Sequence, residues 1–234
     1  MKKFFRIFAK NLIIFSKSDV LGYNTNRKED TRLEHLVNDY LDLHLFNKGY
    51  FSDVEWVKDK KRQLEGADII LNCPSLGIEN ASVDIKSAVK YSNKHLGTYA
   101  LECGFIGRQG DEKIGWLIDE DKKTEYYLLL YPKSQKYYTD MQTVDDIESI
   151  EYYLVSRDKV LNYLKRKGFS KDIIKETVGS MRDEYNGFTK GLVRESGDDG
   201  FFFYLTGNLA EQPVNVVIKR SVYDKISVLH ETVR

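Results

Sequence analysis

The sequence predicts an α/β (α+β) domain with a central mixed β-sheet flanked by helices. Apolar residues recur at helical spacing between about residues 26 and 48, and Gly49 ends that pattern. Several short apolar runs bounded by turn residues follow, and two further helical stretches precede a final pair of strand-like runs. This order of helix, strands, helices and strands favours helices packed against one mixed sheet.

Length and composition allow one large domain, or one domain with a small appendage. The chain has 234 residues, of which 41% are hydrophobic, which is enough to form a substantial core. We expect a core with an N-terminal helix over residues 1–186. Residues 187–234 are expected to form a C-terminal extension that packs on this core and whose function the sequence does not indicate.

The net charge and the cysteines of the chain indicate which partners and which cellular compartment to expect. The net charge is zero, so the total charge neither requires nor excludes a nucleic-acid partner. Two cysteines, Cys73 and Cys103, predict free thiols in a reducing, cytoplasmic compartment. No apolar run is long enough for a membrane span. Because Arg6 and Lys10 interrupt its apolar part, we interpret the N-terminal segment as an amphipathic helix rather than a signal peptide.

The first half of the chain predicts a helix followed by a hairpin. On the helix after residue 26, Glu34 falls at the edge of the apolar stripe, where a solvent-exposed role is as plausible as a functional one. An edge strand at residues 54–57 and a basic loop at 58–62 come next. Residues 67–71 and 82–86 read as two strands, and the turn-rich segment between them predicts a hairpin.

The second half predicts more strands and two adjacent helices. The expected elements are a strand or short helix at 99–103, strands at 115–118, 126–131 and 150–156, helices at 157–167 and 171–185, strands at 201–205 and 214–218, and a helix from residue 221. The adjacent helices could form a helix-turn-helix DNA reader, but the mixed charge of the second helix favours helices that pack on a sheet.

Charged residues interrupt both hairpin strands. Asp68 lies in the first strand, and Asp84 and Lys86 lie in the second. Because side chains alternate along a strand, Asp84 and Lys86 share one face while Val83 and Ile85 share the other. A charged face on an otherwise apolar strand breaks a local rule of folding, and such breaks concentrate at functional sites.

Two carboxylates on neighbouring strands repel each other unless a cation lies between them. Hard oxygen ligands suit Mg²⁺ or Mn²⁺, which take one or two carboxylates together with water and substrate phosphate. A bound divalent ion activates water and stabilises charge on a phosphoryl oxygen. A lysine on the same face can orient the water or neutralise the phosphate, so Asp68, Asp84 and Lys86 indicate a site for phosphodiester hydrolysis.

The spacing of these residues resembles the PD-(D/E)XK nuclease superfamily, which includes many restriction endonucleases. The resemblance covers about residues 26–167 and depends on Asp68, fifteen intervening residues, and then Asp84-Ile85-Lys86. It implies a restriction-endonuclease-like core and a metal-dependent nuclease, most simply a DNA endonuclease, that acts on nucleic acid with Mg²⁺ or Mn²⁺. Many such enzymes are homodimers. Ala67 stands where the superfamily's motif often has proline.

The resemblance also assigns roles to individual residues. Asp68 and Asp84 match the motif acids and Lys86 matches the motif lysine, so these three are the expected catalytic residues. The expected metal ligands are Asp68 and Asp84, with Glu34 as the helix acid. Glu102, on the next element, is a further candidate ligand, although a structural salt bridge explains it equally well.

Nucleic-acid contact is expected through basic loops around the hairpin. Lys61 and Arg62 precede the first motif strand, and Lys90 and Lys94 follow the second. Each cation on a phosphate adds salt-dependent affinity that is independent of sequence. Charge runs are more often solvated surfaces, so these four residues are a weaker indication than the motif.

Two other functional classes remain open at this stage. The first is a nuclease-like fold that does not cut and acts as a nucleic-acid-binding or protein-binding accessory module. The second is a structural domain in which the acids are incidental ion pairs or strand-end residues. The complete set of Asp68, Asp84 and Lys86 favours the nuclease.

Overall fold

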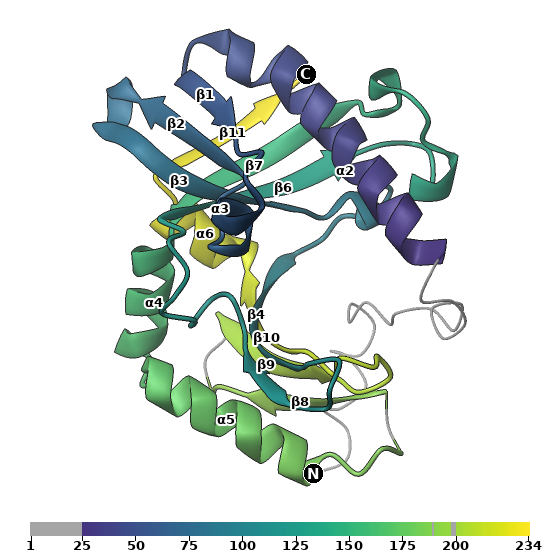
Figure 1. Ribbon diagram of the computed structural model, residues 1–234, viewed down its shortest axis with the longest axis vertical. Helices are drawn as coiled ribbons and strands as arrows, with labels where there is room; N and C mark the ends of the chain where they lie inside the picture. Colours follow the sequence, from purple (N-terminus) through teal and green to yellow (C-terminus); the bar gives the residue numbers. More distant parts are fainter. Residues whose placement is uncertain (1–24, 189, 198–199) are drawn as a thin grey trace.

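A computed structural model of the chain describes residues 25–188, 190–197 and 200–234 and shows an α+β fold with two β-sheets (Figure 1). The amphipathic helix expected at the N-terminus lies outside these residues. The α/β class predicted from the sequence is confirmed. None of the helices in the described part of the chain has the length and apolar character needed to cross a membrane.

The larger sheet has six strands in the order β1-β2-β3-β6-β7-β11. Its β3–β6 pair is parallel and its other neighbouring pairs are antiparallel, so the expected mixed sheet is present. The hairpin and the edge strand are also confirmed. The strands are β1 (Ser52–Trp56), β2 (Ile69–Cys73), β3 (Ile78–Ser87), β6 (Tyr126–Lys133), β7 (Ser149–Ser156) and β11 (Leu229–Val233).

The second sheet was not predicted from the sequence, which indicated one central mixed sheet. It has five strands in the order β5-β4-β10-β9-β8, and β4 pairs with β10 although more than a hundred residues separate them. Strand pairing over such a distance depends on tertiary packing, which the alternation of apolar residues does not report. The strands are β4 (Thr98–Ile106), β5 (Glu112–Ile114), β8 (Gly191–Glu195), β9 (Phe201–Thr206) and β10 (Val214–Lys219).

Helix α2 (Thr25–His44) covers one face of the six-stranded sheet (Figure 1). Its apolar stripe, which includes Leu33, Val37 and Leu41, packs in one core with Ile69 and Val83 of the hairpin. Burial of this stripe explains why the helical pattern of the sequence is so regular. The helix gives way to the 3-10 turn η2 (Phe46–Lys48), and Gly49 follows with a φ of 79° that favours glycine.

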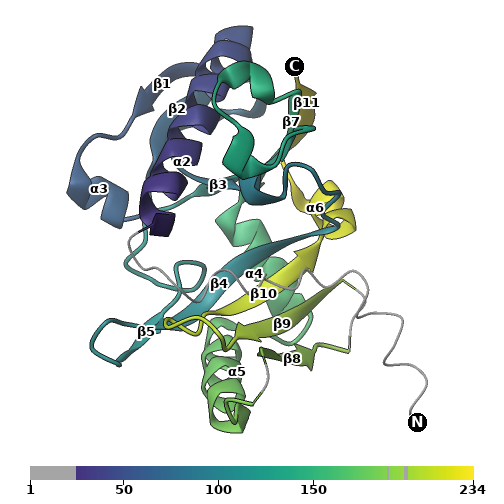
Figure 2. The ribbon, with the colours of Figure 1, turned by 90° about the vertical axis from the view of Figure 1, so that its right-hand side faces the viewer.

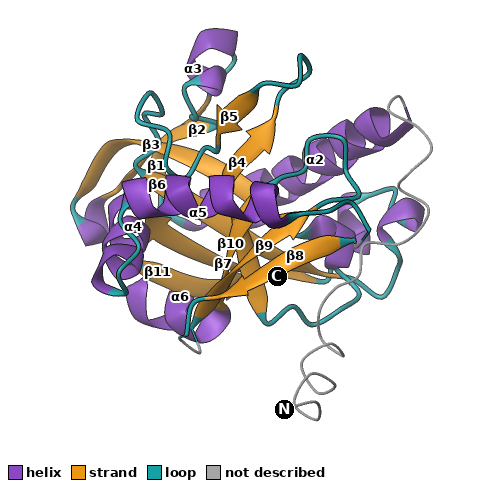
Figure 3. Cartoon of the chain, turned by 90° about the horizontal axis from the view of Figure 1, so that it is seen from below, coloured by secondary structure: helices purple, strands orange, loops and turns teal. Residues whose placement is uncertain are grey.

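The other helices belong mainly to the second core. Helices α4 (Arg157–Arg166) and α5 (Lys171–Glu184) contribute Val160, Leu164, Ile174 and Val178 to the core that also contains Phe203 of β9. Figure 3 shows α5 lying across the five-stranded sheet. Helices α4 and α5 therefore pack in the core beside the sheets. This agrees with the sheet-packing helices that the sequence favoured over a helix-turn-helix DNA reader.

Residues 187–234 are distributed over both sheets. They supply β8, β9 and β10 to the five-stranded sheet and β11 to the edge of the six-stranded sheet. Helix α6 (Arg220–Ile226) connects β10 to β11, and its Val222, Tyr223 and Ile226 are buried in the second core. Figure 2 shows this C-terminal segment, in yellow, running between the two layers.

Two sequence predictions about local structure were wrong. Residues 115–118 form a turn instead of a strand, because Gly115 lies against the backbone of β4. A Cβ atom at Gly115 would lie 2.4 Å from the Cys103 carbonyl carbon, so only glycine fits. The basic stretch after residue 58 is partly helix α3 (Lys60–Leu64), which Asp59 caps by accepting a hydrogen bond from the Arg62 N–H at 2.8 Å.

One buried arginine fixes the segment between β5 and β6. The guanidinium of Arg157, at the start of α4, donates hydrogen bonds to the carbonyl oxygens of Leu117 at 3.0 Å, Lys122 at 2.9 Å and Asp119. Arg157 is 7% exposed. A single side chain therefore satisfies three carbonyl groups of a segment that has no regular ladder of its own.

We expect Arg157→Ala to lower the free energy of unfolding by about 2–4 kcal/mol, because it leaves buried carbonyl groups without donors. Urea unfolding monitored by circular dichroism measures this. Lys159→Ala, at an exposed position on the same helix, is the control and should change stability by less than about 0.5 kcal/mol. Equal unfolding midpoints for the two variants would contradict the role assigned to Arg157.

Candidate functional site

The β2–β3 hairpin brings the two motif acids together. Its register pairs Ile69 with Val83, so Asp68, just before β2, and Asp84, just after Val83, lie at the same end of the paired segment. The Asp68 N–H donates to the Val83 carbonyl at 2.9 Å, and the Ile85 N–H donates to Asp68 Oδ2 at 2.7 Å. Asp68 is thus a strand-end acid tied to a backbone N–H, and it also lies beside Asp84. Two carboxylates this close repel each other when both are charged, so their proximity requires compensation.

Asp84 is buried on the face of the sheet opposite α2. Its parallel neighbour in the ladder is Tyr127, which belongs to the second core, whereas Val83 belongs to the core under α2. Asp84 is 5% exposed, and Lys86 Nζ donates to its Oδ1 at 2.7 Å. The structure therefore confirms the prediction that charged and apolar side chains alternate between the two faces of β3.

Burial raises the pKa of Asp84 to about 7. The ammonium of Lys86 opposes this rise, and the nearby carboxyl group of Asp68 adds to it. Removal of a carboxylate from water disfavours its charged form, and one cation offsets only part of that cost. Asp84 is therefore poised to exchange a proton, or to accept a second cation, near neutral pH.

Aromatic side chains enclose the lysine and the acid. Lys86 Nζ lies 4.8 Å from the centroid of the Trp116 ring, and Trp116 packs edge-on against Tyr127 at 5.0 Å. Burial raises the pKa of Tyr99, and the neighbouring Tyr131 and the Asp84 carboxyl group add to that rise. Trp116 was not predicted as a site residue, because residues 115–118 form an apolar run that is typical of a strand. Gly115 before the tryptophan was the available signal for a turn.

Glu102 approaches the lysine from the second sheet. It lies on β4 opposite Asn215 of β10 and is half-buried. Burial raises its pKa, as does the nearby Glu211, while Lys86 is the first of the cations that lower it. Glu102 is therefore within electrostatic reach of Lys86, although it lies on the other sheet.

Glu34 lies apart from this cluster. It is exposed on α2, and α2 covers the face of the sheet that carries Val83 rather than Asp84. Within the described residues, no hydrogen bond or ion pair joins Glu34 to either motif aspartate. The helical spacing of the sequence predicted that Glu34 lies at the edge of the apolar stripe. That spacing does not predict which face of the sheet the helix covers.

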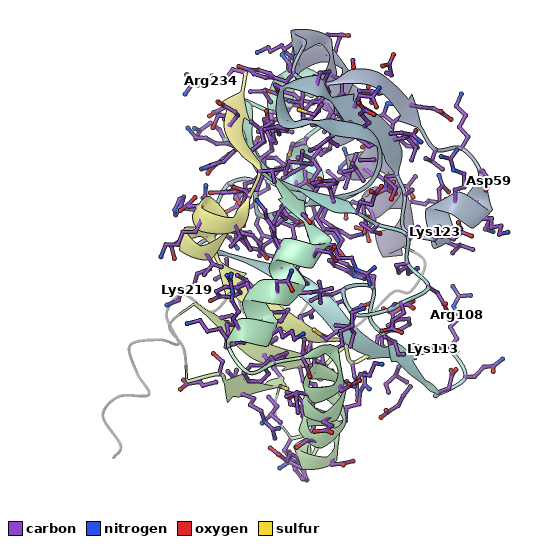
Figure 4. All side chains as sticks on the ribbon, turned by 90° about the vertical axis from the view of Figure 1, so that its left-hand side faces the viewer. Asp59, Arg108, Lys113, Lys123, Lys219 and Arg234 are labelled. Carbon is purple, nitrogen blue, oxygen red and sulfur yellow. The ribbon has the colours of Figure 1, made fainter. Side chains whose placement is uncertain are left out.

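The predicted basic residues lie at the site's end of the hairpin. Lys61 and Arg62 are exposed on α3 just before Asp68, and Lys90 and Lys94 lie just after the end of β3. Two of the four form ion pairs: Arg62 lies 3.8 Å from Glu55, and Lys90 lies 2.6 Å from Asp30. Such exposed pairs are weak and exchange readily for other anions. Figure 4 shows Asp59 of α3 and Lys123 on the same edge of the molecule.

The donor set fits a hard divalent cation with few protein ligands. Asp68 and Asp84 provide adjacent carboxylate oxygens, and Mg²⁺ accepts one or two carboxylates when waters and phosphate complete its shell. Across the described residues, no group of three or more His, Cys, Asp or Glu side chains is arranged to hold a metal ion. An ion at this site would therefore depend on substrate or solvent for most of its ligands.

Comparisons with known proteins do not assign the chain. No protein-family model matches it, and neither the curated proteins nor the solved structures contain a match.

The raised pKa of Asp84 has a consequence for stability. Because the folded chain binds this proton more tightly than the unfolded chain, the free energy of unfolding should fall as pH rises from about 4 to about 7. Asp84→Asn removes the titrating group, so the variant should gain about 2 kcal/mol more over wild type at pH 8 than at pH 5. Urea unfolding at both pH values measures the difference.

Asp39→Asn serves as the control for this comparison. Asp39 is exposed on α2, and its substitution removes the same charge without touching the site. The stability difference between this variant and wild type should be the same at pH 5 and pH 8. An Asp84→Asn chain whose advantage over wild type is the same at both pH values would show that Asp84 carries no raised pKa.

Proposed function

We propose that the protein is a divalent-metal-dependent nuclease that hydrolyses phosphodiester bonds, most simply a DNA endonuclease. The observation that carries the proposal is the buried Asp84 beside Asp68, with Lys86 bonded to it at 2.7 Å. A chain that buries one acid beside a second acid and a half-buried lysine gives up stability, and functional sites are where such costs persist. The resemblance of Asp68, Asp84 and Lys86 to the PD-(D/E)XK motif, with its restriction-endonuclease-like core, supports the same reaction.

In this proposal each residue has a distinct task. Asp68 and Asp84 would hold Mg²⁺ or Mn²⁺, which when bound lowers the pKa of water and neutralises charge on the phosphate. Asp68 is positioned for this by its hydrogen bond from the Ile85 N–H. Lys86 would turn from Asp84 to the scissile phosphate or the attacking water once a metal ion neutralises that carboxylate.

The environment of Lys86 supports such a movement. Its side chain is 30% exposed, whereas that of Asp84 is 7% exposed, so the ammonium lies on the solvent side of the pair. Trp116 beneath it offers a cation–π contact, which restrains the ammonium without fixing it on one oxygen. Glu102 supplies a second nearby carboxyl group on the β4 side, where it can bind the ammonium or an outer-sphere water of the metal.

The second candidate is a nuclease-like fold that binds nucleic acid or protein without cutting. One observation favours it: the Asp84 carboxylate is buried and already paired with Lys86, an arrangement that competes with metal. The two functions differ in metal affinity and in cleavage, and both are measurable. For the nuclease, a second copy of the chain is the partner that would allow both strands of a duplex to be cut.

The wild-type chain should cut at least one of supercoiled plasmid, linear duplex, single-stranded DNA or RNA when Mg²⁺ or Mn²⁺ is present. Asp84→Asn and Lys86→Met should each lower the rate by a factor of about 10² or more, because each removes charge from the reacting centre. Asp39→Asn is the matched control and should cut at the wild-type rate. Cleavage that survives both site substitutions would exclude this site as the catalytic centre.

Metal affinity should depend on pH in a defined direction. A proton and a metal ion compete for Asp84, whose pKa is about 7. The Mn²⁺ association constant should therefore rise about tenfold per pH unit below pH 7 and level off above it. Calorimetric titration at pH 6, 7 and 8 measures this. No binding by the intact chain at pH 8 would favour the non-cutting module instead.

A further inference from the structure

A second concave site lies at the C-terminal end of α2, beside the edge strand β1 (Figures 1 and 2). It is a cavity of about 300 Å³, which falls at the lower end of the range for small-ligand sites. Its apolar residues belong to the core under α2. The cavity therefore lies on the face of the sheet opposite Asp84.

Three aromatic rings line this cavity. The Phe46 ring meets the Trp56 ring at 6.0 Å and 73°, and it meets the Phe51 ring at 6.0 Å and 75°. Such edge-to-face pairs leave more of the ring faces uncovered than a stack does. Phe51 is buried, whereas Phe46 and Trp56 are half-buried. An aromatic face attracts a cation, and groups of aromatic rings recognise quaternary ammonium ions.

The charged residues of the lining are both acids. Asp42 Oδ1 accepts a hydrogen bond from Trp56 Nε1 at 2.9 Å, and Asp53 Oδ2 accepts one from Asn72 Nδ2 at 2.7 Å. Within the described residues, no lysine or arginine lines the cavity, and no ion pair neutralises either acid. A cation that pairs with Asp42 therefore lies beside the indole ring of Trp56.

The position of Asp42 is unfavourable for the helix that carries it. Asp42 lies in the last turn of α2, where the helix dipole contributes about half a negative charge and favours cations over anions. The hydrogen bond to Trp56 does not explain the charge, because the amide oxygen of an asparagine would accept it equally well. Two carboxylates and a helix C-terminus thus concentrate negative potential in a concave, partly apolar site.

These features together select an organic cation. A hydrated inorganic ion would gain little from an aromatic wall, whereas alkyl groups on an ammonium pack against it. An extended peptide is less suitable, because Asp53 and Glu55 are exposed on β1, and charges on an edge strand discourage pairing with another strand.

We propose that this cavity binds a small, free organic ammonium ion of the class that includes choline and short alkylamines. The ammonium group pairs with Asp42 and Asp53, and its alkyl groups pack against Phe46 and Trp56. The site is separate from the Asp84 centre and requires no cleavage. The proposal therefore does not depend on nuclease activity.

The first test compares choline with 3,3-dimethylbutan-1-ol, its neutral isostere in which carbon replaces the nitrogen. The chain has two tryptophans, so its ¹H–¹⁵N spectrum should contain two indole N–H resonances, which Trp56→Phe assigns. Choline should shift the Trp56 resonance with a saturable dependence on concentration and leave that of Trp116 unchanged. The alcohol should bind about tenfold more weakly or less, because it lacks the charge.

The second test removes the two acids. Asp42→Asn/Asp53→Asn keeps both hydrogen-bond acceptors and should bind choline about tenfold more weakly than wild type. Its matched control, Asp39→Asn/Glu55→Gln, removes two exposed acids of α2 and β1 that do not line the cavity. The control should stay within about twofold of wild type. Matching melting temperatures establish that both variants are folded.

Three results would overturn the proposal. One is equal affinity of wild type for choline and its neutral isostere, or binding of neither, and this comparison requires no variant. Another is equal affinity of the test and control variants for choline. The third is binding of a lysine-containing peptide without binding of choline, since the occupant would then be a partner chain. Asp84→Asn should bind choline as wild type does, so failure at the hairpin site and failure at this cavity give different patterns.

Discussion

The carboxyl group of Asp84 must be accommodated in an apolar region where the two sheets meet, and much of the surrounding structure serves this purpose. Lys86 neutralises it at 2.7 Å, and the Trp116 ring holds the lysine from the other side at 4.8 Å. Trp116 lies in a turn that Gly115 allows by its close approach to β4. Arg157 fixes the next part of that segment through the Leu117 carbonyl. The site is thus supported by residues far from it in sequence.

The local pattern of the chain predicted much of this arrangement. The charged face of β3 and the hairpin that places Asp68 beside Asp84 follow from strand alternation and turn residues alone. The length of α2 also follows, because its apolar stripe is continuous and Gly49 follows it in a left-handed conformation. These features depend on residues that are close in sequence, where periodicity is a reliable guide.

Features that depend on long-range pairing were not predicted. Nothing in the alternation of β4 indicates that it pairs with β10, and that pairing is part of the second sheet, which carries Glu102. For Glu34, the sequence predicted the position on the helix but not the face of the sheet that α2 covers. Glu34 therefore lies away from the two motif aspartates. The run at residues 115–118 was assigned as a strand because a short apolar run has no distinctive period.

The central claim is that Asp84 is a buried carboxyl group poised between a proton and a metal ion. The most direct measurement is an NMR titration of the ¹³Cγ resonance of Asp84, assigned with Asp84→Asn, first without metal and then with Mg²⁺. We expect a pKa of about 7 without metal and a clear decrease when Mg²⁺ is added. An Asp84 that titrates near 4 and does not respond to Mg²⁺ would contradict both the burial argument and the metal site.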